Sequence, residues 1–252
     1  MTLSNSPLPI PALNSSSSQD DGRDDDRRVL LEAILSEAAF DGWTRTAIDR
    51  AALSEGYTSR EVARGDVKIL FPKGVRDVLD FWASEEDRLM RERFVGLNAR
   101  PEKIRDKIKW LVRQRIEQLE NHREAARRAA ATLALPHLAG LGAQLAWRSA
   151  GQMWEALGDR STDANFYTKR ATLSAVYLST LTRWFADEGD GEMGDPRSAT
   201  WHFLDQRIDN VMQFEKVKAQ ARKWGPSGEA VAGLLGRLRY AGAKPSDQGD
   251  MK

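Results

Sequence analysis

The sequence has 252 residues, of which 41% are hydrophobic and 30% charged, with a formal net charge of +1. This size and hydrophobic content suit one or two globular units with a core, which excludes a wholly disordered chain and a fibre. The balanced charge gives no general attraction to nucleic acid, and the absence of cysteine excludes disulfides, thiol nucleophiles and thiolate metal sites.

Residues 1–25 are rich in Ser, Pro and Asp and contain no sustained apolar run, which predicts a disordered tail. The first basic residue is Arg23, which lies among aspartates. A mitochondrial presequence is instead rich in arginine and poor in acidic residues. The segment therefore predicts no presequence, and we expect a cytoplasmic protein of bacterial type.

From Asp26 onward the apolar residues follow a helical period, and no strand-like alternation is sustained. The sequence therefore predicts an all-α fold. We divide it into a tail (1–25), a helix-turn-helix-like head (26–72), a helical domain (73–223) and an amphipathic helix with a tail (224–252). The expected helices are 26–39, 44–55, 58–65, 73–97, 101–119, 121–134, 137–157, 162–187, 197–223 and 228–241.

The head has the layout of a helix-turn-helix, with a helix at Thr44–Glu55, a turn at Gly56 and a short segment that opens at Thr58. Together with the Phe-Pro-Lys-Gly run at residues 71–74, it resembles the head of TetR-type repressors. A DNA reader needs a recognition helix with base-reading and phosphate-binding side chains. Gly65 interrupts the segment 58–68, and acidic residues reduce its net positive charge. We therefore expect no specific binding of nucleic acid.

The helix expected at 137–157 carries broad indoles and small residues on one face, a pattern that can leave a groove. An apolar stripe on the helix expected at 162–187 would face it and complete an elongated pocket for a lipid tail. Ordinary close packing is the alternative for both patterns. The predicted lipid-binding residues are Trp147, Ala150, Gly151, Trp154, Leu173, Val176, Tyr177, Leu181 and Trp184.

The run GDRSTDANFYTKR at residues 158–170 places aromatic and charged groups at a helix start without residues suited to catalysis. Tyrosine and arginine often dominate the binding energy of protein interfaces, so this run predicts a partner-binding surface, although such a stripe can also be core. The predicted partner-binding residues are Asp159, Asp163, Phe166, Tyr167 and Arg170.

Candidate catalytic groups are not clustered in this sequence. The three histidines, His122, His137 and His202, are far apart and none has a second ligand at metal-binding spacing. Phosphate-binding loops and nucleophile elbows are also missing. We therefore expect no catalytic residue, no metal and no cofactor.

The helix expected at 228–241 has an apolar sector flanked by arginines, as helices at membrane interfaces do. The sequence contains no run of about 18 apolar residues, the length that spans a bilayer. We therefore expect reversible, peripheral contact with an inner membrane. The alternative is that this helix packs on the core or on a second subunit. The predicted membrane-binding residues are Val231, Leu234, Leu235, Arg237, Leu238 and Arg239.

Four separated runs resemble the ubiquinone-biosynthesis accessory protein family: FDGWT (40–44), LFPKG (70–74), GDRSTDANFYTKRA (158–171) and TWHFLDQRIDNVM (200–212). Members of this family are TetR-like lipid-binding partners of a quinone-ring hydroxylase. The resemblance implies a non-enzymatic homodimer that binds an isoprenoid quinone precursor or other lipid and helps the hydroxylase to reach it. Phe166 stands where the family often has Trp, which keeps an aromatic group. The competing hypothesis is a TetR-type transcription regulator with an apolar effector.

Overall fold

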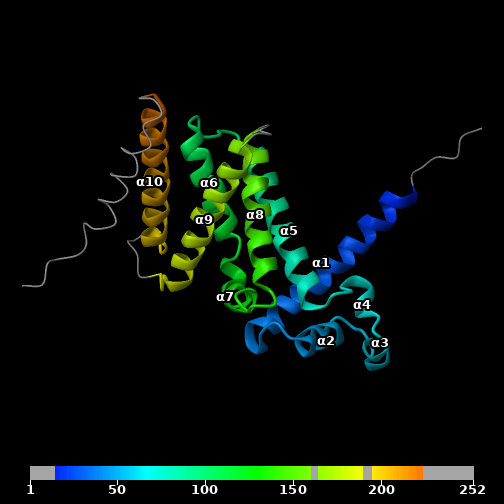
Figure 1. The fold of residues 1–252 in the computed structure, drawn as a ribbon. Coiled ribbons are helices and arrows are strands. Elements are labelled where there is room, and N and C mark those ends of the chain that lie inside the picture. Colours follow the sequence, from blue (N-terminus) through cyan, green and yellow to red (C-terminus); the bar gives the residue numbers. More distant parts are fainter. Residues whose placement is uncertain (1–14, 160–163, 190–194, 224–252) are drawn as a thin grey trace, which may run out of the picture. The chain divides into compact units, whose positions relative to one another are not determined.

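The computed structural model describes residues 15–159, 164–189 and 195–223, and within these ranges every regular element is a helix (Figure 1). The predicted all-α fold is confirmed. Residues 1–204 form one compact unit and residues 205–252 a second. The elements are α1 (Ser15–Asp41), α2 (Arg45–Ser54), α3 (Ser59–Arg64), α4 (Val67–Leu70), α5 (Val75–Val95), α6 (Ile104–Glu117), the short 3-10 helix η1 (Glu120–His122), α7 (Arg123–Leu133), α8 (Ala139–Ala156), α9 (Ala164–Ala186) and α10 (Ser198–Lys223).

Helix α1 begins at Ser15, so residues 15–25 are helical where the sequence predicted a disordered tail. The charged residues that suggested disorder are paired along the helix surface. Arg27 lies 3.1 Å from Asp24, and Arg28 lies 2.7 Å from Asp25. Arg28 also reaches Glu85 of α5 at 2.8 Å, which ties this part of α1 to the first unit.

Helices α2 to α4 form the head, and α2 and α3 have local reasons to begin or end where they do. The Thr44 hydroxyl caps α2 by accepting a hydrogen bond from the Ala47 amide at 3.1 Å. Thr58 and Glu61 form a capping box at the start of α3, and Gly65, with φ of +87°, ends it. The sequence predicted this break but missed α4, whose Val67 and Leu70 side chains are buried.

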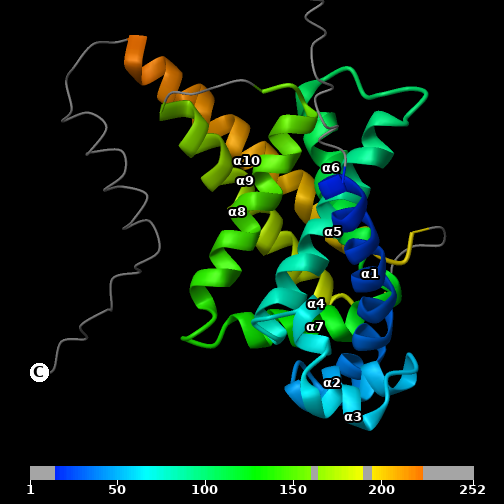
Figure 2. The same ribbon diagram turned by 90° about the vertical axis from the view of Figure 1, so that its right-hand side faces the viewer.

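Helices α5, α6, α8 and α9 pack against one another as a bundle, and α7 contacts both α8 and α1 (Figures 1 and 2). Trp43 joins the head to this bundle. Its indole Nε1 donates to the Ala125 carbonyl of α7 at 2.9 Å, and its ring stacks on Trp82 of α5 with centroids 5.6 Å apart. The head and the bundle therefore share one core within the first unit.

The second unit, taken by itself, contains the continuation of α10 from residue 205 to residue 223. The predicted helix at 228–241, and with it every predicted membrane-binding residue, lies outside the described residues. Among the helices described, none has both the length and the apolar character that crossing a membrane requires.

Candidate ligand-binding cavity

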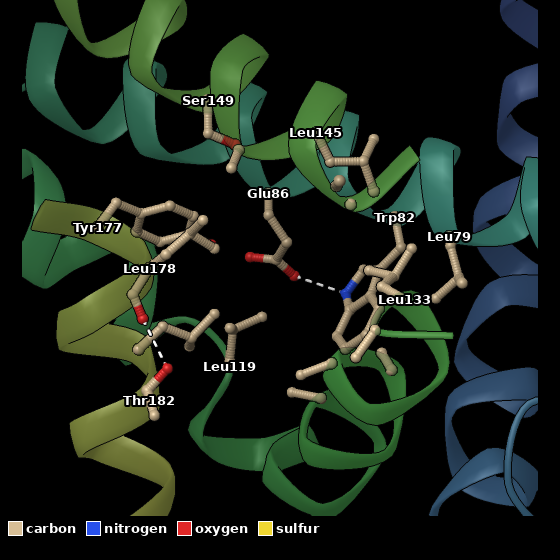
Figure 3. A pocket seen from close by; sticks show the side chains of 18 of the residues that line it. Leu79, Trp82, Glu86, Leu119, Leu133, Leu145, Ser149, Tyr177, Leu178 and Thr182 are labelled. Carbon is tan, nitrogen blue, oxygen red and sulfur yellow. Dashed lines mark hydrogen bonds between the residues drawn. The ribbon is translucent and has the colours of Figure 1, made fainter. Parts of the chain in front are cut away.

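A cavity of about 580 Å³ lies within the first unit, bordered by α5, α6, α7, α8 and α9 (Figure 3). Its volume falls in the range of small-molecule sites, roughly 300–1,000 Å³. Most of its wall is apolar. The lining residues include Leu79, Trp82, Glu86, Arg115, Leu119, Ala126, Ala129, Ala130, Leu133, Gly142, Leu145, Ala146, Ser149, Tyr177, Leu178, Leu181, Thr182 and Phe185.

Small side chains explain why this space is open. Helix α7 presents Ala126, Ala129 and Ala130 to the cavity, and α8 presents Gly142 and Ala146. These positions recur at intervals of three or four residues, so each set occupies one face of its helix. The bulky side chains that these two helices add to the wall are Leu133 and Leu145, and the space that a well-packed core would fill remains open beside the small residues.

The cavity has an open apolar end and a buried polar end. At the open end Ala134, Ala139 and Ala143 are exposed, and Leu178 keeps 44% of its surface accessible. At the buried end lie Glu86, Arg115, Ser149 and Tyr177, each of them buried.

Hydrogen bonds fix the carboxylates at the polar end. Glu86 accepts from the Trp82 indole at 3.0 Å and from the Gln118 amide at 2.7 Å, and Figure 3 shows its carboxylate between Trp82 and Tyr177. Asp87, the next residue of α5, accepts from Arg115 Nε at 2.8 Å and from the Ser149 hydroxyl at 2.7 Å. Each buried carboxylate here therefore has partners that offset part of its desolvation, although Asp87 Oδ2 accepts no hydrogen bond among the described residues.

Two pKa shifts define the protonation states at this end. Burial raises the pKa of Tyr177, against the opposing effect of Arg115, so its phenol keeps its proton at neutral pH. Burial acts to lower the pKa of Arg115, but Tyr177, Asp87 and Glu86 outweigh it and raise that pKa, so the guanidinium stays charged. The polar end thus offers a neutral phenol and a permanent cation.

The predicted lipid-binding set coincides with the cavity at two residues, Tyr177 and Leu181. On α8 the sequence selected a face about one residue away from the cavity, a rotation of roughly 100°. That face packs on the start of α9: the Trp154 indole donates to the Lys169 carbonyl at 3.2 Å. The residues that do not line the cavity are Trp147, Ala150, Gly151, Trp154, Leu173, Val176 and Trp184.

The alanine face of α7, which forms part of the cavity wall, was not predicted from the sequence. Its signal is present in REAARRAAATL, residues 123–133, where alanines recur at helical spacing opposite arginines. Alanine is a strong helix former and so common in helices that this pattern alone did not indicate a cavity. Only the pairing with the small residues of α8 makes it informative.

The predicted partner-binding surface is partly buried. Tyr167 is 63% exposed, and its ring lies 5.1 Å from that of Phe166 and 6.2 Å from that of Trp147. Arg170, in contrast, is 5% exposed and its guanidinium lies 3.4 Å from the centre of the Phe166 ring. The expectation of an exposed arginine at the centre of this surface is therefore wrong.

Of the two acidic residues expected at the edge of this surface, the structure describes one, Asp159. Asp159 is largely buried and lies 2.7 Å from the Lys169 ammonium group. Its other oxygen is 4.0 Å from Arg170. Asp163 lies outside the described residues. Asp159 and Arg170 together hold the end of α8 against the start of α9.

Residues 139–215, which include α8 and α9, match the family model described as COQ9. The human ubiquinone biosynthesis protein COQ9, mitochondrial, is 31% identical over 215 residues, which cover 82% of this chain and 63% of the human protein. COQ9-B of Xenopus laevis is 32% identical over 221 residues, or 83% of this chain and 69% of that protein. The chain belongs to the COQ9 family of ubiquinone biosynthesis proteins. It spans less than two thirds of the length of its human relative.

The relatives correct the expected location. The human protein, its Drosophila melanogaster relative (27% identical over 198 residues, 77% of this chain and 57% of that protein) and COQ9-B are all named as mitochondrial. The expectation of a cytoplasmic protein on a bacterial inner membrane is contradicted by these COQ9 names. It rested on the composition of residues 1–25, which does not report the compartment of this family.

Proposed function

We propose that this member of the COQ9 family is a non-enzymatic accessory protein that binds a prenylated quinone precursor and presents it to a ring hydroxylase. The observation that carries the proposal is the apolar cavity between α7 and α8. Burial of a prenyl tail there would contribute roughly 0.8 kcal/mol for each CH₂ group removed from water. The named role of the relatives in ubiquinone biosynthesis supports this class of ligand.

The chemistry of the polar end supports binding in preference to catalysis. Asp87, whose Oδ1 accepts from Arg115 and Ser149, does not line the cavity, and both oxygens of Glu86, which does, accept hydrogen bonds from side chains of the protein. A general base needs a free lone pair directed at the proton that it removes, and a nucleophile needs such a base beside it. These carboxylates serve instead as fixed acceptors.

The aromatic cluster of Trp147, Phe166 and Tyr167 is our proposed contact for the hydroxylase, with Tyr167 as its exposed centre. An exposed aromatic ring supported by two others offers a rigid contact area at a small entropic cost. Tyr167→Ala should reduce recovery of the hydroxylase in co-purification, while Leu178→Ala, at the mouth of the cavity, should not. Equal recovery with wild type and Tyr167→Ala would remove the cluster from the partner contact.

Native mass spectrometry tests the binding of the lipid. The purified chain is mixed with a prenylated quinone precursor in mild detergent, and the mass of the complex is measured. We expect an adduct of one ligand for each chain, as a single cavity of this size allows. Absence of any adduct under conditions in which the protein stays folded would refute the proposed function. The proposal also includes membrane contact through Leu234 and Leu238, which liposome flotation tests. It includes homodimerisation as well, which the mass of the unliganded protein tests.

A further inference from the structure

The buried end of the cavity contains hydrogen-bond donors that the protein does not use. Arg115 is 4% exposed, and its guanidinium donates one hydrogen bond, from Nε to Asp87, so its two terminal nitrogens have no hydrogen-bond partner among the described residues. The Tyr177 hydroxyl also forms no hydrogen bond among the described residues. A buried donor without a partner costs about 1–3 kcal/mol. Both residues line the cavity, so an oxygen atom of a bound ligand can satisfy them.

The charges around these donors give no excess of positive charge. Arg115 lies 2.8 Å from Asp87, and Arg148 lies 3.8 Å from Asp87 and 2.7 Å from Asp80. With Glu86, two cations face three carboxylates, so the site cannot offset the desolvation of a phosphate or carboxylate. A neutral acceptor gains the free hydrogen bonds without that cost.

We propose that Arg115 and Tyr177 bind a neutral oxygen of the ligand, such as a quinone carbonyl or a phenol oxygen, at the buried end of the cavity. The tail then runs along the alanines of α7 and reaches the mouth between Leu178 and Ala143. This inference rests on the proposed function and refines it. Since the ring is held away from solvent, the ligand must leave the cavity before the hydroxylase can act on it.

The test measures the dissociation constants of ligands that share one short prenyl tail and differ in their head. Three probes are used in equilibrium dialysis: a prenylated benzoquinone, the unsubstituted prenyl hydrocarbon and the prenyl diphosphate. We expect the quinone to bind at least about tenfold more tightly than the hydrocarbon, equivalent to about 1.4 kcal/mol. The diphosphate should bind more weakly than the quinone.

Arg115→Lys is the informative variant, because lysine keeps the positive charge beside Asp87 and removes the unused guanidinium donors. It should erase most of the preference for the quinone and leave the affinity for the hydrocarbon unchanged. Tyr177→Phe, which keeps the ring and removes the hydroxyl, should weaken the preference in the same sense and serves if Arg115→Lys does not fold.

The outcomes separate this inference from the proposed function. Equal affinity for the quinone and the hydrocarbon, tightest binding of the diphosphate, or a full quinone preference in both variants would overturn the head-group assignment while the tail site stands. If none of the probes binds to the folded protein, the proposed function fails together with the inference.

Discussion

The two faces of α8 both combine small residues with large side chains, yet only one of them borders a cavity. On the cavity face, Ala146 lines the cavity together with the alanines of α7, whereas a Cβ added at Gly142 would lie 3.3 Å from the Leu133 Cβ atom. On the other face, Gly151 meets Arg170 of α9, and a Cβ added at Gly151 would lie 3.4 Å from the Arg170 Nε atom. A small residue therefore leaves open space only where the facing helix is small as well. Where a long side chain faces it, the same residue permits close packing.

The largest expected loss of stability comes from removing the Arg170 side chain that packs on the Gly151 face of α8. Arg170→Ala should lower the free energy of unfolding by about 2–4 kcal/mol, because a buried side chain that packs on Phe166 and Gly151 is removed. Urea denaturation measures this effect. Arg45→Ala, which removes an ion pair with Asp49 at the surface, should cost less than about 1 kcal/mol. Similar losses for the two variants would mean that Arg170 does not fill this face.

A smaller loss is expected at the indole that the sequence assigned to the lipid. Trp154→Ala should cost about 2 kcal/mol, below the value for a fully buried tryptophan, since the side chain is only partly buried. Binding of a prenyl tail by the folded variant should equal that of wild type, because Trp154 does not line the cavity. Loss of binding in the same titration would restore the face predicted from the sequence.

The smallest changes are expected at the glycines of α8, and they have the opposite sign. A Cβ at Gly140 would meet nothing within 4 Å, so Gly140→Ala should stabilise the protein by about 0.5–1 kcal/mol through helix propensity. Gly151→Ala should gain less because its Cβ contacts Arg170. Thermal denaturation measures the gain in stability of the two variants, Gly140→Ala and Gly151→Ala. A larger gain at Gly151 than at Gly140 would show that the two helices are not closely packed there.

The bounds of the long helices could be predicted from the sequence. Helices expected at 137–157 and 162–187 are found at Ala139–Ala156 and Ala164–Ala186, because a sustained helical period and flanking breaks are local properties. The start of α1 could not, since its acidic residues suggest disorder, and its Arg23 donates to the carbonyl of Ile69, 46 positions later in the chain, at 2.6 Å. Contacts of that kind have no local signal.

The site was harder to predict than the fold. Tyr177 and Leu181 were identified because α9 has one strong apolar stripe, which has to enter the core. Helix α8 has apolar or small residues around most of its circumference, so its sequence does not determine which face meets which neighbour. Arg170 was assigned to the surface because arginines usually lie there; the space beside Gly151 that buries it depends on tertiary packing.

The central claim, that the space between α7 and α8 holds the lipid tail, is tested most directly by two adjacent substitutions on α7. Ala130 lines the cavity, whereas Ala131 is exposed to solvent on the same helix. Binding of a prenylated quinone precursor to Ala130→Phe and Ala131→Phe is compared by native mass spectrometry. We predict that Ala130→Phe fills the cavity and loses the ligand adduct while Ala131→Phe retains it. An adduct of equal intensity in both folded variants would contradict the account.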